Sequence, residues 1–125
     1  MTDNIKKRID EIYDETVEIR RDLHMHPELS EHEVRTAKKI SGYLSRWGIE
    51  HRCGVAGNGI VAWIEGRKPA QGDLLFRGVG IRADMDALPV KELADVPFRS
   101  VNEGVMHACG HDIHTAVALG SARIL

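Results

Sequence analysis

The order of sequence patterns along the chain predicts an α/β fold with a mixed sheet and flanking helices. Two amphipathic helical patterns come first, two short apolar segments around a glycine-rich turn follow, and a third helical pattern closes the chain. Its 125 residues fit a single domain and suffice for one hydrophobic core. Such sheets carry polar residues at the ends of their strands, where functional sites form.

The first helix is predicted from apolar residues that recur at spacings of three and four between Ile5 and Leu23. Pro27 ends this pattern, because its ring cannot continue a helix. Ser30 and Glu33 then match a capping box, in which each side chain satisfies a free amide at a helix start. A second helix is therefore expected to begin there.

The second helix is predicted to end at Gly48, since glycine suits the left-handed conformation after a helix terminus. Two strands are expected at residues 49–55 and 60–65, joined by a tight turn at residues 57–59 whose glycines and asparagine tolerate positive dihedral angles. The apolar stripe of the helix consists of Ala37, Ile40, Leu44 and Trp47.

The second half of the chain alternates between apolar and polar stretches. An apolar run at residues 74–81 indicates a buried strand, and residues 89–103 lack periodicity and indicate a surface segment. A helix is expected after Asp112, and it reaches Leu125 without a glycine cap. On this pattern the chain looks truncated within its last helix.

The composition argues against several classes of function. A formal net charge of -2 and a pI near 6.4 provide no field that would attract nucleic acid or an anionic membrane surface. No apolar run approaches the roughly 20 residues of a membrane helix, and the N-terminus lacks a signal-peptide pattern. We therefore expect a cytoplasmic protein with reduced thiols, in which Cys53 is half-buried and Cys109 is available for chemistry.

Residues 104–115 predict a metal site. Cys109 and His111 are two apart, so both side chains can point to one side of a looped backbone, where they suit zinc, manganese, cobalt or nickel. Two ligands do not make a tight site, and His107 and His114 are candidates because helical spacing would place them near the face of His111. Gly110 argues against a regular helix there. The alternative is that these histidines are ordinary polar residues.

Three acidic residues have open roles at this level. Asp112 either caps the following helix or holds a ligating imidazole in the right tautomer. Asp84 and Asp86 follow the predicted strand two residues apart, so both carboxylates can share a face and bind cations or orient imidazoles. Equally, they can hydrogen-bond the turn that follows, with Arg82 as a structural ion-pair partner.

Three segments resemble the successive signatures of metal-dependent amidohydrolases, a family that includes hippurate hydrolase, N-acyl-amino-acid aminohydrolases and plant auxin-conjugate hydrolases. They are Leu23 to Ser30 (LHMHPELS), Arg82 to Pro89 (RADMDALP) and Gly104 to Thr115 (GVMHACGHDIHT). The resemblance implies a hydrolase with two divalent metals per complete site, drawn from Mn²⁺, Zn²⁺, Co²⁺ and Ni²⁺. Such an enzyme removes the acyl group of a small N-acyl-amino acid with a metal-activated water.

The same resemblance assigns roles to individual residues. It implies that Cys109 and His111 are metal ligands and that Asp86 is a carboxylate orienting a ligand from behind. Asp84 stands where related aminoacylases and carboxypeptidases have a ligating histidine, so its direct role stays open. His107, His114 and Asp112 are further candidates for such a supporting position.

The resemblance also implies that residues 1–125 are the N-terminal part of a zinc-exopeptidase-like catalytic domain. The remaining ligands, the glutamate general base and an inserted domain used for homo-oligomer formation would lie beyond the equivalent of Leu125. We therefore expect these 125 residues alone to be inactive. The alternative is a catalytically inactive, truncated module that binds metal or another protein.

Overall fold

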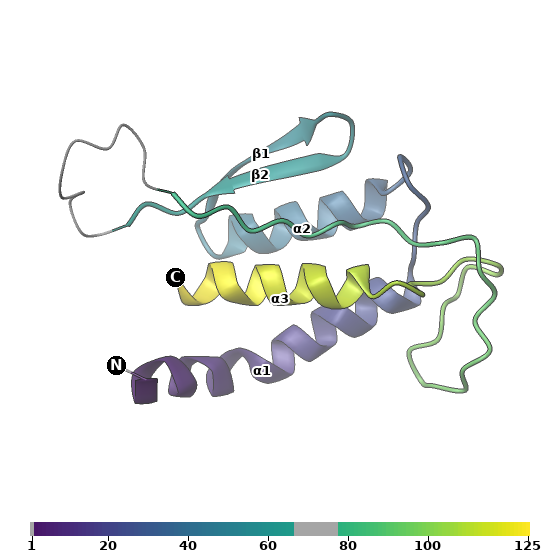
Figure 1. The fold of residues 1–125 in the computed structure, drawn as a ribbon, viewed down its shortest axis with the longest axis horizontal. Helices are drawn as coiled ribbons and strands as arrows, with labels where there is room; N and C mark the ends of the chain where they lie inside the picture. The colour runs from purple at the N-terminus through teal and green to yellow at the C-terminus, as the bar shows by residue number, and fades with distance from the viewer. Residues whose placement is uncertain (1, 67–77) are drawn as a thin grey trace.

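The computed structural model describes residues 2–66 and 78–125. In these ranges the chain forms α1 (Thr2–Met25), α2 (Val34–Arg46), β1 (Glu50–Val55), β2 (Gly59–Trp63) and α3 (His111–Ile124). Helix α3 lies between α1 and α2, and the β1–β2 hairpin lies along α2 on the side away from α3 (Figure 1). The predicted α/β class is confirmed.

Helix α1 has the predicted amphipathic pattern, but only its second half reaches the core. Ile19 and Leu23 are each 2% exposed, whereas Ile5 and Ile9 remain 46% and 44% exposed. The apolar spacing therefore predicted the helix correctly, but it overestimated how much of the helix is buried in the core. No helix in the described part of the chain is long and apolar enough to cross a membrane.

The predicted capping box at the start of α2 is wrong. Glu33 is the N-cap residue and makes no side-chain capping hydrogen bond. Instead, the two carboxylate oxygens of Glu28 accept hydrogen bonds from the amides of Arg35, at 3.0 Å, and Thr36, at 2.7 Å. The turn after α1 folds Glu28 back over the helix start, so a carboxylate from outside the Ser30–Glu33 pattern satisfies these free amides.

The end of α2 agrees with the prediction. Gly48 has a φ of 69°, in the left-handed region, and the next amide, that of Ile49, donates to the carbonyl of Leu44 at 2.9 Å. Leu44 is buried in the core, whereas Trp47 is only half-buried and stacks on Tyr43 with ring centroids 5.6 Å apart.

The predicted hairpin is confirmed, with β1 and β2 antiparallel and Cys53 opposite Ile60. Its turn differs from the expected one, because the positive φ angles fall on Ala56, at 50°, and Gly57, at 98°. Gly59 is needed for another reason, since a Cβ atom there would clash with the carbonyl oxygen of Val55. Cys53 is exposed, not half-buried as predicted.

The strand predicted at residues 74–81 is not found in the part of it that the structure describes. Residues 74–77 lie outside the described residues, and residues 78–81 form no strand. Val79 and Ile81 are 95% and 62% exposed. An apolar run becomes a buried strand only when a neighbouring strand pairs with it, and the described residues provide no such ladder there. Residues 89–103 form the predicted segment without helix or strand.

The core forms where the three helices meet. Its buried apolar residues are Ile19, Leu23, Ile40, Leu44, Ala116 and Leu119. Helix α3 packs directly against α1 at Gly120, where an added Cβ atom would lie 3.4 Å from the hydroxyl oxygen of Thr16, an ordinary contact distance. Outside the core, Glu15 on α1 pairs with Arg46 of α2 and Arg123 of α3. This packing fixes the position of the α3 N-terminus, where the predicted metal ligands lie.

Candidate metal centre

A sharp turn at Gly110 delivers the two predicted ligands. Gly110 is the N-cap of α3 and has a φ of 89°, which glycine adopts without the strain of a Cβ atom. The helix starts at His111, slightly earlier than the sequence predicted. Cys109 precedes the turn and is exposed, and His111 follows it and is half-buried. A thiol and an imidazole thus flank one turn at the surface of the protein.

Asp86 holds the ring of His111. The Oδ1 atom of Asp86 lies 2.9 Å from Nδ1 of His111, and the Asp86 carbonyl oxygen lies 3.0 Å from the same nitrogen. Both oxygens are acceptors, so Nδ1 is the nitrogen that donates, and in the neutral ring Nε2 then carries the lone pair. A histidine that binds metal through Nε2 needs this tautomer, and a carboxylate behind the ring is its usual support.

Backbone hydrogen bonds fix the segment that carries Asp86. The Ala87 amide donates to the carbonyl of Glu28 at 2.7 Å. Leu88 and Met106 exchange two hydrogen bonds of 3.0 and 3.1 Å between their backbones. The acidic segment is therefore attached both to the turn after α1 and to the loop before Cys109. These contacts bring together two segments that the sequence could relate only through the family resemblance.

The donors present fit part of a metal coordination shell. One thiolate and one imidazole suit zinc or another first-row divalent metal, and a protein site needs three or four ligands. Within residues 2–66 and 78–125, no group of three or more His, Cys, Asp and Glu side chains is arranged to hold a metal ion. The roles of Cys109 and His111 as ligands therefore stay a prediction, and further ligands must be supplied from elsewhere.

His107 is buried, whereas His111 is half-buried and His114 is exposed. His107 is 5% exposed, and its ring centroid lies 6.4 Å from that of His24. Neither of its ring nitrogens has a hydrogen-bond partner among the described residues. Burial lowers the pKa of His107 below its usual value, although the charge of Asp112 opposes this effect. Helical spacing grouped His107 with His111 and His114 incorrectly, because the helix begins only at His111.

His114 and Asp84 lie near His111. Among the described residues, neither side chain forms a hydrogen bond with His111. His114 is exposed, and its ring centroid is 5.8 Å from that of His111. Asp84 pairs with Arg82 at 2.9 Å, as one of the two sequence interpretations predicted. Its carbonyl oxygen also accepts a hydrogen bond of 3.1 Å from the hydroxyl of Thr115. The Asp84 carboxylate is 47% exposed, so this ion pair contributes little stability.

Asp112 supports an imidazole, but not that of a predicted ligand. It provides no side-chain cap for α3. Its carboxylate is fully buried, and Oδ2 lies 2.7 Å from Nδ1 of His24 and 2.8 Å from Nε of Arg20. On the other side of the ring, Nε2 of His24 lies 3.0 Å from Glu92. Sequence reasoning missed this cluster, although the paired histidines of LHMHPELS were the visible signal.

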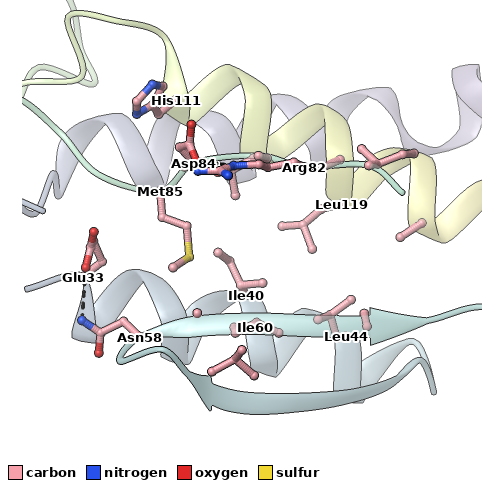
Figure 2. Close-up of a pocket in the computed structure, with 18 of the residues that line it drawn as sticks. Glu33, Ile40, Leu44, Asn58, Ile60, Arg82, Asp84, Met85, His111 and Leu119 are labelled. Atoms are coloured by element: carbon pink, nitrogen blue, oxygen red, sulfur yellow. Dashed lines mark hydrogen bonds and ion pairs between the residues drawn. The ribbon is translucent and has the colours of Figure 1, made fainter. Parts of the chain in front are cut away.

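An open pocket of about 1180 Å³ begins beside His111 and is lined by α3, α2, the hairpin and the segment of residues 79–86. Its apolar walls include Ile40, Leu44 and Leu119, and Met85 points into it (Figure 2). At one end Asn58 donates a hydrogen bond of 3.1 Å to Glu33 (Figure 2). His111 is therefore placed where a polar loop meets a large apolar hollow.

Comparison with known proteins identifies relatives that are similar to this chain along almost its whole length. Residues 80–125 match the model of Peptidase family M20/M25/M40. YhaA of Bacillus subtilis is 47% identical over 121 residues, which cover 97% of this chain and 29% of YhaA. The N-acyl-L-amino acid amidohydrolase of Geobacillus stearothermophilus is 43% identical over 122 residues, covering 98% of this chain and 31% of that protein.

A solved structure agrees with these relatives. The crystal structure of Bacillus subtilis YXEP, described as a dinuclear metal binding peptidase from the M20 family, matches with a TM-score of 0.81 and 43% sequence identity. The match covers 91% of this chain and 30% of YXEP.

The proteins that this chain resembles in sequence and fold form a class, the hydrolases of the metallopeptidase and amidohydrolase type. The similarity to the M20 family confirms the resemblance stated from the sequence. The chain spans about 30% of the length of these relatives. The activity of a whole family protein is therefore a proposal for this one.

Proposed function

We propose that this chain forms part of the catalytic domain of a metal-dependent amidohydrolase that hydrolyses N-acyl-amino acids. The observation that carries the proposal is the contact of 2.9 Å between Asp86 and Nδ1 of His111, next to the exposed thiol of Cys109. The amidohydrolase of Geobacillus stearothermophilus and the dinuclear YXEP structure support the substrate class and the need for divalent metal.

In this proposal each residue has a defined task. Cys109 provides a thiolate ligand, His111 provides Nε2, and Asp86 keeps the His111 ring in the tautomer that exposes that nitrogen. Divalent metal at this position, two ions in a complete centre, supplies Lewis acidity and activates a water. Manganese, zinc, cobalt and nickel all suit these donors. The general base and the remaining ligands come from outside these 125 residues, so the chain alone is inactive.

Cobalt titration tests the ligand assignment directly. The chain should develop a thiolate-to-cobalt charge-transfer band that disappears in Cys109→Ala and weakens in His111→Ala. Cys53→Ala is the matched control, because Cys53 is the other exposed free cysteine and lies on β1. A band that survives in Cys109→Ala and disappears in Cys53→Ala would overturn the assignment.

An activity assay tests the incompleteness of the centre. The purified chain, with added manganese or zinc, should not hydrolyse hippurate or N-acetyl amino acids. Turnover that disappears in Cys109→Ala would show that the chain is complete after all. Tight, stoichiometric metal uptake by a monodisperse chain that unfolds cooperatively would instead favour an inactive binding module.

For the complete protein, the proposal includes a small N-acyl-amino-acid substrate, a cytoplasmic location and assembly into a homo-oligomer. The residue-level proposal does not depend on these features. They are tested separately, by substrate screening, by cell fractionation and by measuring the molar mass in solution.

A further inference from the structure

The imidazole of His24 lies between two buried carboxylates. Its Nδ1 is 2.7 Å from Oδ2 of Asp112, and its Nε2 is 3.0 Å from Oε1 of Glu92. The three side chains are 7%, 0% and 3% exposed. They come from the end of α1, the start of α3 and the segment between residues 88 and 106. One ring therefore connects three parts of the fold away from solvent.

The buried carboxylates of this cluster are surrounded by hydrogen-bond donors. Carboxylate oxygens only accept hydrogen bonds, and the His24 ring presents one nitrogen to Asp112 and the other to Glu92. Arg20 also lies here, with Nε 2.8 Å from the same Asp112 oxygen and Nη2 3.2 Å from Nδ1 of His24. Such donors are what a buried carboxylate requires.

Glu92 is anchored on its other side as well. Its Oε2 accepts a hydrogen bond of 2.7 Å from the amide of Ser100, and its carbonyl oxygen accepts one of 2.7 Å from Arg99. Burial alone would raise the pKa of Glu92, but the hydrogen bonds from Ser100 and His24 outweigh it, and the pKa lies below its ordinary value. Glu92 therefore stays ionised and available to His24 at neutral pH.

The two carboxylates lie on opposite sides of the predicted ligand loop in the sequence. Glu92 precedes this loop, and Asp112 directly follows His111. Further contacts join the same region to the end of α1, because the Val101 amide donates to the Met25 carbonyl at 2.9 Å. His24 is thus a side chain of α1 that contacts both Asp112, directly after the Cys109–His111 turn, and Glu92, in the segment that leads to this turn.

We propose that His24 is a positioning residue that clamps Asp112 and Glu92 and thereby fixes the Cys109–His111 loop in the geometry needed for metal binding. The inference deepens the proposed function and rests on it for the ligand roles of Cys109 and His111. The clamp itself is a property of this chain, and it is testable without metal.

His24→Gln is the variant that removes the imidazole ring bridging the two carboxylates, and His26→Gln is its matched control. His26 lies on the same turn, but its Nδ1 contacts the carbonyl oxygen of Asp22, at 2.9 Å, instead of the clamp. Exchange of the hydrogen-bonded amides of Ala108, Ile113 and His114 should become about tenfold faster or more in His24→Gln, because the variant leaves buried partners unsatisfied and loosens the loop. Exchange in β1 and β2 should stay unchanged, and His26→Gln should resemble the wild type.

Unchanged exchange at Ala108, Ile113 and His114 would overturn the proposal. Equal acceleration in the loop and in the hairpin would also overturn it, because that result indicates general destabilisation. If His24→Gln does not fold, Glu92→Gln replaces it, since this variant removes one anion of the clamp and should accelerate the same amides. Normal exchange in a folded Glu92→Gln chain would then refute the clamp.

Cobalt binding supplies a readout that simple stabilisation would not change. In His24→Gln the thiolate-to-cobalt band of Cys109 should shift and weaken under conditions where the variant is fully folded, while His26→Gln keeps the wild-type spectrum. An unaltered spectrum in His24→Gln would refute the link between the clamp and the metal loop. Absence of the band in the wild type would refute the proposed metal centre, and hydrogen exchange would still decide whether the clamp exists.

Discussion

Nδ1 of His111 lies 2.9 Å from Oδ1 of Asp86, a residue 25 positions earlier in the chain. The contact fixes the tautomer of a half-buried histidine and directs the chemistry of its free nitrogen. It also gives Asp86 a different environment from Asp84, whose carboxylate pairs with Arg82 at the surface. The two carboxylates of the RADMD segment therefore have separable effects.

Asp86→Ala should reduce the affinity for Co²⁺ or Zn²⁺ by about 10- to 100-fold, because carboxylates behind ligating histidines typically contribute that much. Isothermal titration of the purified chain measures the effect. Asp84→Ala is the control and should change the affinity much less, since its carboxylate is 47% exposed and paired with Arg82. An equal loss in both variants would contradict an orienting role specific to Asp86.

Glu28→Gln should lower the free energy of unfolding by about 0.5–2 kcal/mol, since glutamine carries no charge and its single carbonyl oxygen replaces two accepting carboxylate oxygens. The amides are those of Arg35 and Thr36, at 3.0 and 2.7 Å from the carboxylate. Urea denaturation followed by circular dichroism measures the change. Ser30→Ala tests the capping box predicted from the sequence. It should have almost no effect on the free energy of unfolding, because Ser30 is exposed. A larger cost for Ser30→Ala would restore the capping-box interpretation.

The stability contributed by Glu92 should depend on pH with a definite sign. Its pKa is lower in the folded chain than the ordinary value of 4.5, so its contribution is fully present above that value and is lost as the pH falls through the folded pKa. The difference in unfolding free energy between wild type and Glu92→Gln should therefore be largest near neutral pH and shrink as the pH falls below 4.5. Denaturant titrations across this range provide the measurement, and a difference independent of pH would contradict the interpretation.

Gly59→Ala should destabilise the chain by about 1–3 kcal/mol, because the added Cβ atom would force the backbone of β2 away from the carbonyl of Val55. Thermal unfolding and hairpin amide exchange both report this change. Gly42→Ala is the control, since a Cβ atom at this exposed position of α2 meets nothing within 4 Å. It should stabilise the chain by up to about 1 kcal/mol through helix propensity. Equal effects of the two substitutions would show that the close approach at Gly59 is unimportant.

The sequence by itself determined the features that depend on neighbouring residues. Apolar spacing of three and four predicted α1 and α2, Gly48 marked the end of α2, and the glycine-rich turn located the hairpin. These signals are reliable because helices and turns are set by backbone conformation and by side chains within a few residues. The ligand loop was visible for the same reason, since its cysteine and histidines lie close together in the sequence.

Only the tertiary structure decided which distant groups meet. His24 contacts Glu92 and Asp112 across 68 and 88 residues, and Asn102 donates to the carbonyl of Pro27 across 75. The spacing of residues in a sequence carries no information about such pairs, because they form only when separate segments pack together and must satisfy one another away from water. For the same reason His107 is buried away from the helix face that its spacing suggested, and Glu28 rather than Ser30 caps α2.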